Sequence, residues 1–360
     1  MRYSTIVGID THARKNSVCA LDTKTGEITQ ATLSADPDQL VSWIEKGGFA
    51  KPVHCVYESG PTGFGLARAL VEAGVPCTVA AASKLPRRTD KQKNDKRDAQ
   101  WLARMAAAGS VRAVYIPTPE QESLCHLSRL RDEAARDLKR ARQRVASFLL
   151  LTRTSYTLTK KRWTKRFYEW SAAYEFPCEG DTFAFRSKVN AALRCEERLR
   201  EIEDEMERAA AGSPDVSKAM ERLLCIHGIG KVTAFALVCE VYDFHRFSKG
   251  SAFASFVGLV PSESSSGAKE ARGPIAKTGN SHLRRLLMEA AGCYSNRVKA
   301  VKLEDGRIPE AVRAKVEKCA SRLKKRRERL RERKVPANKA KVAVARELCE
   351  WIYYIMVVPA

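Results

Sequence analysis

STIVGIDTHARKNSVCALD (residues 4–22) decides the fold of the first part of the chain. It contains two β-rich runs, one that stops at Asp10 and one that starts at Asn16, with a short polar segment between them. The turn residues that follow lead into a third β-rich run within residues 23–33. The sequence therefore predicts a domain that starts with consecutive strands, the first of which ends on a carboxylate.

Strand and helix signals alternate downstream of these strands. The predicted order is a capped helix over 36–47, a strand that stops at Glu58, a helix over 64–74, a strand over 75–82 and, after a very basic loop, a helix over 94–107. Alternation of this kind is typical of an α/β domain. We assign it to residues 1–115.

Charge is the strongest signal in the composition. The chain has 360 residues, enough for two or three domains, and Lys plus Arg exceed Asp plus Glu by 22. Such an excess is typical of a nucleic-acid partner. The sequence has no apolar run of membrane-spanning length and no signal-peptide pattern, so we expect no membrane partner and a soluble, cytoplasmic protein.

Cysteine and histidine show no metal-binding pattern. The chain has eleven Cys without a C-x-x-C pair and six His without an H-x-x-x-H spacing, which argues against a zinc site. Free thiols, mostly buried, in a reducing compartment are the expected state.

The composition changes after about residue 115. Apolar residues recur at three- and four-residue steps over 124–148 and again over 185–206, on both sides of an aromatic and basic segment at 159–180. This pattern predicts an antiparallel coiled-coil arm over 116–214, with a structural or dimer-forming role.

Two segments follow the arm. We assign residues 215–296 to a mainly α-helical domain and residues 297–360 to a helical tail. The tail contains the run RLKKRRERLRERK, which is either a solvated basic helix or, in so basic a protein, a surface that contacts phosphate groups.

Four carboxylates stand at predicted element edges. Asp10 and Glu58 end strands, and Asp95 and Asp98 lie one helical turn apart on one helix face. In a ribonuclease-H-like sheet the ends of the first and fourth strands are neighbours and a following helix covers them, so the four would converge. Two Mg²⁺ or Mn²⁺ ions ~4 Å apart would neutralise them and support phosphodiester cleavage.

The alternative for these aspartates is structural. Asp95 and Asp98 lie among Lys93, Lys96 and Arg97, so they would also serve as surface ion-pair partners.

A Ser-rich segment, SESSSG at 262–267, is predicted to be a loop before a basic helix. Such loops are usually only flexible, but here Lys277, Arg284 and Arg285 follow and would hold a phosphate.

Upstream, the segment HGIGK opens a predicted helix. Gly228 and Gly230 permit close backbone approach, and the helix N-terminus beside Lys231 attracts phosphate, as in helix-hairpin-helix DNA binders. Tight turns use the same glycine spacing.

Taken in order, these motifs resemble the DEDD-type transposases of the "insertion sequence one-ten" family, also called bridge recombinases. The similarity covers most of the chain, in VGIDTHARKNSV, YESGPTGFGLARAL, KNDKRDAQWLA, LLCIHGIGKVTAFAL and FASFVGLVPSESSSGAKEARGPIAKTGNSHLRRLLMEAA. The long basic tail departs from the family pattern.

The resemblance implies a RuvC-like domain joined through a coiled coil to a transposase domain. By motif, the DEDD residues fall on Asp10, Glu58, Asp95 and Asp98. The catalytic serine precedes a glycine, which points to Ser266, while Ser265 stays an alternative. It further implies a structured noncoding guide RNA that pairs with donor and target DNA, a phosphoserine intermediate, and dimers that pair into tetramers with composite sites.

Two other functions remain open. A metal-only RuvC-like nuclease or junction resolvase would use the serine loop only to bind DNA. A non-enzymatic protein that binds RNA or DNA would carry a degenerate nuclease fold, although all four acidic positions are filled.

Overall fold

The computed structural model describes residues 3–86, 94–159, 161–266, 269–295, 298 and 308–359, except for the side chains of 263–272. The chain divides into two compact units, residues 1–118 and 119–360.

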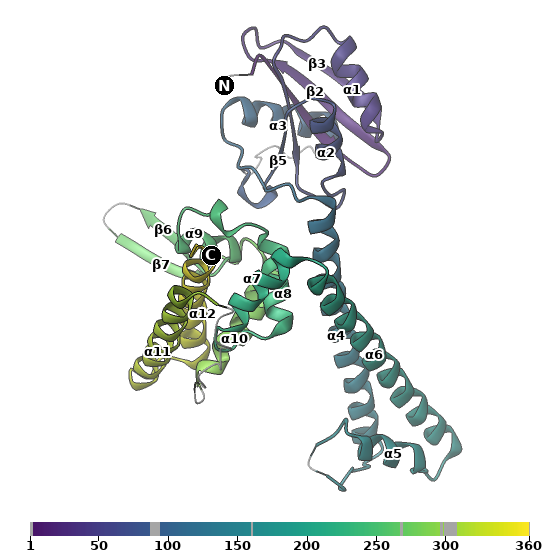
Figure 1. Ribbon diagram of the computed structural model, residues 1–360. Helices are drawn as coiled ribbons and strands as arrows, with labels where there is room; N and C mark the ends of the chain where they lie inside the picture. The colour runs from purple at the N-terminus through teal and green to yellow at the C-terminus, as the bar shows by residue number, and fades with distance from the viewer. Residues whose placement is uncertain are drawn as a thin grey trace. The chain divides into compact units, whose positions relative to one another are not determined.

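A mixed five-stranded sheet forms the first unit (Figure 1). Its strands are β1 (Thr5–Thr11), β2 (Lys15–Asp22), β3 (Ile28–Ser34), β4 (Val53–Glu58) and β5 (Cys77–Ala80). Their order is β3-β2-β1-β4-β5, with antiparallel pairing on the β3 side of β1 and parallel pairing on the β5 side. The predicted α/β class, with the first and fourth strands as neighbours, is confirmed and is consistent with a RuvC-like fold.

Helices cover both faces of this sheet. They are α1 (Pro37–Lys46), α2 (Gly65–Glu72) and α3 (Asp95–Ala107), with a 3-10 turn at Ala82–Lys84. Val7 and Ile9 pack on one face in a cluster with Leu40 of α1 and Leu70 of α2. The alternate residues of the strands turn to the other face, where Ile6 packs with side chains of α3.

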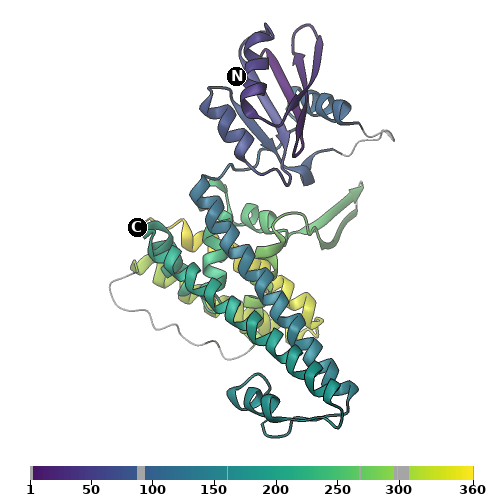
Figure 2. The ribbon, with the colours of Figure 1, turned by 90° about the vertical axis from the view of Figure 1, so that its right-hand side faces the viewer.

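Two long helices begin the second unit. α4 (Pro119–Leu151) and α6 (Glu179–Ala211) pack along each other, with the short α5 (Lys165–Ala173) between them in sequence (Figure 2). Arg131 bonds to Glu203 near one end and Arg142 bonds to Glu196 further along, so the two helices are antiparallel. The helix pair is as predicted, and its supercoiling as a coiled coil stays a prediction.

Aromatic side chains close the far end of the helix pair. Phe167 of α5 is fully buried there against Tyr156 and Trp163, with ring centroids 5.1 Å and 4.9 Å away. The aromatic segment thus supplies a small core that ties the α4–α6 connection to its helices.

The rest of the second unit is mainly helical. Its elements are α7 (Pro214–Leu224), α8 (Lys231–Val241), α9 (Gly250–Val257), α10 (Ser281–Gly292), α11 (Glu310–Glu332) and α12 (Ala337–Met356), with 3-10 turns at Phe244–Arg246 and Cys293–Ser295 and strands β6 (Pro261–Ser266) and β7 (Lys269–Ile275). α7, the glycine turn and α8 follow one another as a helix, a hairpin and a helix. Their identity as a DNA-binding helix-hairpin-helix stays a prediction.

The last two helices belong to the same core as the helices before them. Leu323 of α11 and Leu348 of α12 are fully buried in one cluster with Leu223, Phe253 and Leu287. The charges of residues 297–360 predict a tail, but the apolar faces of α11 and α12 complete this core.

The Ser-rich segment differs from its prediction as a loop. Residues 261–266 form β6, which pairs antiparallel with β7, with Ser264 opposite Ala271 and Ser266 opposite Lys269. The preference of a residue for strands depends on its context, so pairing with a neighbouring strand overrides the turn preference of serine.

The thiols and the apolarity of the helices are the last features of the described residues. All eleven cysteines are free thiols, and seven of them are buried. No helix in the described ranges combines the length and apolarity that a membrane crossing requires.

Candidate active site and nucleic-acid interface

Strand register brings Asp10 and Glu58 to one edge of the sheet. β1 and β4 are parallel, and Ile9 lies opposite Tyr57, so the next residue on each strand is a carboxylate. Side chains alternate along a strand, and Glu58 is two residues beyond Val56, which packs with α3. Glu58 and Asp10 therefore project from the α3-covered face.

Gly8 lets α3 lie directly on this face. A Cβ at Gly8 would overlap the Ala99 carbonyl oxygen and lie 2.7 Å from the Ala103 nitrogen, so no larger residue fits beneath the helix. α3 begins at Asp95 because the Asn94 side chain accepts a hydrogen bond from the Lys96 amide. Its first turn, which carries Asp95 and Asp98, is thereby placed over the end of β1.

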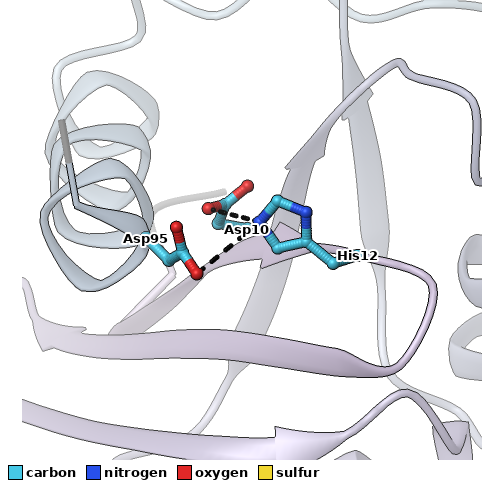
Figure 3. A group of neighbouring side chains, drawn as sticks. All are labelled: Asp10, His12 and Asp95. Carbon is cyan, nitrogen blue, oxygen red and sulfur yellow. Dashed lines mark hydrogen bonds and ion pairs between the residues drawn. The ribbon is translucent and has the colours of Figure 1, made fainter.

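Asp10, His12 and Asp95 form one group of metal-binding type (Figure 3). Each offers a ligand atom, and these atoms lie within 4.8 Å of one another. His12 Nε2 is 3.3 Å from Asp10 Oδ2 and 3.8 Å from Asp95 Oδ2. His12 is not among the predicted site residues, although it comes directly after the end of β1 and two residues after Asp10, the spacing at which side chains of an extended chain point the same way.

Lys15 balances part of the negative charge. Its Nζ donates a hydrogen bond of 2.7 Å to Asp95 Oδ2. This bond lowers the pKa of Asp95 and raises the pKa of Lys15. Both side chains are exposed, so the pair marks local charge compensation and not a large contribution to stability.

Glu58 and Asp98 lie outside the compact group that the described side chains form. Asp98 is in the first turn of α3, which also carries Asp95, and Glu58 ends β4, the parallel neighbour of β1. The fold therefore brings two of the four predicted carboxylates into contact range and holds the other two on the same face.

The donor set fits a divalent cation. The side chains of Asp10 and Asp95 are 26% and 37% exposed, so a hydrated ion can reach them. Carboxylate oxygens suit Mg²⁺ and Mn²⁺, and the imidazole of His12 adds a nitrogen donor that Mg²⁺ favours less.

The predicted nucleophile lies in the β-hairpin. Ser265 and Ser266 are the last two residues of β6, opposite Glu270 and Lys269 of β7. Their side chains fall outside what the structure describes, as does Gly267.

The HGIGK segment forms the turn between α7 and α8. Gly228 has a φ of +87°, and a Cβ there would lie 2.7 Å from the Ala290 carbonyl oxygen. Its close approach is thus to α10. Gly230 is the N-cap residue of α8, and the exposed Lys231 bonds to Glu207 of α6 at 2.7 Å.

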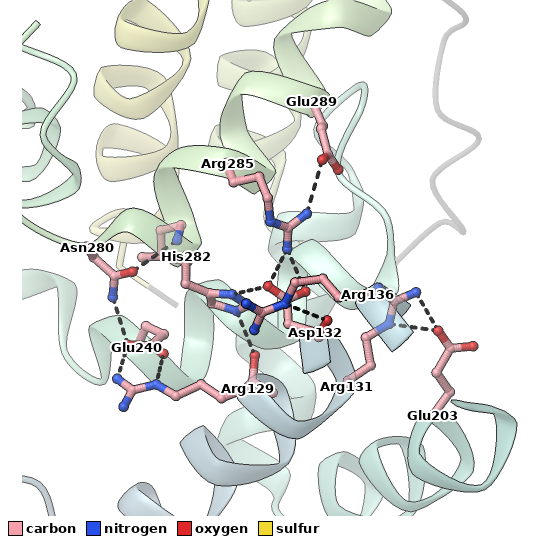
Figure 4. Close-up of polar contacts among 12 residues, drawn as sticks. Arg129, Arg131, Asp132, Arg136, Glu203, Glu240, Asn280, His282, Arg285 and Glu289 are labelled. Atoms are coloured by element: carbon pink, nitrogen blue, oxygen red, sulfur yellow. Dashed lines mark hydrogen bonds and ion pairs between the residues drawn. The ribbon is translucent and has the colours of Figure 1, made fainter. Parts of the chain in front are cut away.

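Two of the three predicted phosphate-binding cations are held by protein groups. Arg284 donates to the Val257 carbonyl oxygen at the end of α9, 2.9 Å away. Arg285 pairs with Asp132 of α4 and with Glu289 (Figure 4). Lys277 is exposed and has a φ of +56°.

Asp132 belongs to a polar network between α4 and α10. His282 Nδ1 lies 2.7 Å from Asp132 Oδ2, and His282 Nε2 lies 3.1 Å from the Ser128 hydroxyl. Burial alone would raise the pKa of Asp132, but the hydrogen bonds with His282 and Arg285 outweigh it and lower that pKa to about 2. The arrangement resembles a Ser-His-Asp triad, but Ser128 is only 2% exposed, so its hydroxyl is not accessible as a nucleophile.

A second network ties α4 to α8. Arg129 makes a bidentate pair with the buried Glu240, at 2.8 Å and 3.0 Å, and Asn280 donates to the same carboxylate at 2.7 Å. Together with the Asp132 network, it fixes the start of the long helix pair on the helical domain. Among the described residues, a cavity of about 540 Å³ lies beside both networks, lined by Arg129, Arg136, Asn280, His282 and Arg285 among others.

Comparison with protein families gives two matches. Residues 7–154 match the family DEDD_Tnp_IS110, described as "Transposase", and residues 220–304 match the family described as "Transposase IS116/IS110/IS902 family". The first match spans all four carboxylates, and the second spans the hairpin and α8 to α10.

Individual relatives agree with these families. A Sinorhizobium fredii protein named as a transposase, y4qE, is 31% identical over 97% of this chain and 87% of its own length. The transposase of insertion sequence element IS1533 from Leptospira borgpetersenii is 32% identical over 69% of this chain and 73% of its own. The transposase of element IS1111A from Coxiella burnetii is 29% identical over 64% of this chain and 63% of its own.

Proposed function

This chain belongs to the IS116/IS110/IS902 family of transposases, and from that membership we propose that it is a DNA recombinase guided by a structured noncoding RNA. As a transposase of an insertion sequence it is an enzyme that cleaves and joins DNA strands. The guide RNA, the serine nucleophile and the assembly of dimers into tetramers are the parts we propose.

The observation that supports a nuclease-type centre is the convergence at the end of β1. Asp10, His12 and Asp95 come together from two elements, and the β1–β4 register puts Glu58 on the same edge. We assign Asp10, Glu58, Asp95 and Asp98 as the residues that would hold Mg²⁺ or Mn²⁺. When bound, such ions stabilise the charge of attacking and leaving oxygens in a phosphodiester exchange.

Ser266 is the proposed nucleophile for strand exchange. Its hydroxyl oxygen would bond to phosphorus while the bond from phosphorus to the leaving deoxyribose oxygen breaks, and the reverse step would join a new strand. A serine hydroxyl is a weak nucleophile at neutral pH, so a partner group must activate it. We propose that the carboxylate site of a partner chain does so.

The discriminating experiment detects labelled DNA attached to protein on a denaturing gel. Ser266→Ala should keep RNA and DNA binding and lose both the covalent adduct and strand exchange. An adduct that disappears only in Ser265→Ala would move the nucleophile by one residue. An adduct that survives both changes would exclude a serine nucleophile in this hairpin and favour a metal-only nuclease.

The four carboxylates are tested separately. Asp10→Ala, Glu58→Ala, Asp95→Ala and Asp98→Ala should each abolish recombination while the protein stays folded, because loss of one ligand unbalances the site. Wild-type recombination by three or more of these variants would exclude the metal site.

Mixing variants tests whether sites are shared. Ser266→Ala protein mixed with Asp10→Ala protein should regain part of the activity, because some assemblies would then contain one intact composite site. No recovery at any mixing ratio would argue for a site within one chain.

A further inference from the structure

Basic side chains gather at the junction of α11 and α12, in a segment that the functional assignments above do not use. Residues 322–334 hold nine Lys or Arg and two Glu. The matches to the two families end at residue 304, so α11 and α12 lie outside both. These charges need an account of their own.

Some of these cations have a structural partner. Arg322 and Arg326 both bond to Glu347 of α12, at 2.8 Å and 3.0 Å, and so hold the two helices together. Other cations of this segment line a cavity instead.

A cavity of about 340 Å³ lies beside this junction, and cations from one stripe of α11 line it. Lys324, Arg327 and Arg331 follow the three- and four-residue spacing of one helix face, and Lys334 comes two residues after the end of the helix. Glu328 is the acidic side chain in this lining. Four cations that face one carboxylate repel one another, and a bound anion would relieve that repulsion.

The start of α12 adds to the positive potential. Its N-cap residue, Pro336, provides no side-chain hydrogen bond to the first amides of the helix, and Ala337 of the first turn lines the cavity. The N-terminus of a helix of 20 residues carries partial positive charge. Arg327 donates to the Ala337 carbonyl oxygen at 3.2 Å, which fixes its guanidinium at the cavity wall.

Lys334 occupies a backbone position that favours glycine. The amide of Lys334 bonds to Arg331 and the amide of Val335 bonds to Leu330, the two bonds of a Schellman motif, and Lys334 has a φ of +53°. A lysine at this position makes the fold less stable than a glycine would. What the lysine provides is a fourth cation at the cavity.

We propose that this cavity binds a phosphate group of the DNA backbone. The four cations of the lining and the start of α12 favour an anionic ligand. DNA is the polyanion on which a transposase acts. The proposal needs only that action on DNA and is independent of the guide RNA and of Ser266.

The test compares two triple variants of the full chain. Lys324→Gln/Arg331→Gln/Lys334→Gly empties the cavity of three cations. Lys325→Gln/Arg329→Gln/Arg333→Gln removes the same charge from exposed positions of α11 and its C-cap that do not line the cavity. Affinity for a labelled random-sequence duplex is measured by fluorescence anisotropy at several salt concentrations.

We expect the cavity variant to bind DNA about tenfold more weakly than the control variant. The slope of its log affinity against log salt concentration should also be smaller in magnitude by about one. Equal losses in the two variants would overturn the proposal in favour of diffuse charge. A loss confined to a structured RNA would overturn the assignment to DNA.

The single change Lys334→Gly separates ligand binding from folding. It should raise the melting temperature, because glycine suits the left-handed backbone, and still weaken DNA binding. Unchanged affinity in this variant would count against the site. Because the readout is binding of DNA and not recombination, failure of the catalytic assignment would not be mistaken for failure of this one.

Discussion

Gly8 is the residue on which the geometry of the candidate active site depends sterically. Since a Cβ there would overlap the backbone of α3, Gly8→Ala must push the helix away from β1. We expect a loss of about 1–3 kcal/mol of stability, measured by urea unfolding, together with loss of recombination.

Gly65 provides the matched control for Gly8. It lies at the start of α2, and an added Cβ would meet no atom within 4 Å, so Gly65→Ala should leave stability and activity nearly unchanged. If the two alanine variants were equally stable, the close contact of α3 with β1 would not exist in solution.

Asp132 predicts a pH dependence of stability. Its pKa is lowered to about 2 in the folded protein, against about 3.9 when unfolded. Its stabilisation is therefore complete above the unfolded value and is lost as the pH falls from about 4 to 2. The groups that face its carboxylate are His282 and Arg285 of α10.

The measurement is urea unfolding of wild type and Asp132→Asn. The variant should be less stable by the order of 1–2 kcal/mol at pH 6, and the two proteins should converge as the pH falls towards 2. A difference independent of pH would show that the carboxylate charge is not what stabilises this contact.

Among the helices, α12 allows the clearest prediction of a change in stability. Leu348 is fully buried in the core that α11 and α12 share with α7 to α10. Leu348→Ala should cost about 2–5 kcal/mol. Leu150, which is 81% exposed on α4, gives the control, and Leu150→Ala should have little effect. Similar melting temperatures for the two variants would contradict the packing of α12.

The elements of the first unit follow closely from the sequence. Strands that alternate with capped helices are set by local signals, such as the Asn94 cap of α3 and the strand end at Glu58. Two predictions, the loop at 262–267 and the tail at 297–360, differ from the structure because pairing or packing with other segments decides those elements. β6 exists because β7 pairs with it, and the last two helices belong to the core because α12 packs on α9 and α10, more than 40 positions away in the sequence.

The candidate site was predictable to the same extent. The position of Asp10 beside Glu58 follows from strand order, which a fold class implies. The bond from Lys15 to Asp95 joins residues 80 positions apart, and no sequence spacing signals it. The alternation of side chains along an extended chain is a local signal that could have indicated His12, two residues after Asp10.

The net charge of the whole chain predicts how it binds nucleic acid. With an excess of 22 positive charges, the protein should bind nucleic acid with steep salt dependence through counterion release. We also expect tighter binding to the element's structured RNA than to random duplex DNA. Filter binding across a salt series measures both, and equal affinity for the cognate RNA and a scrambled RNA would exclude the guide.

The shared core of the last helices has a genetic consequence. A stop codon between residues 297 and 340 would remove α12, and with it the fully buried Val344 and Leu348, instead of trimming a dispensable end. The shortened product would unfold and be degraded before it met an intact chain. Decayed copies of the element with late stop codons should therefore behave as recessive null alleles and not as inhibitors of their full-length relatives.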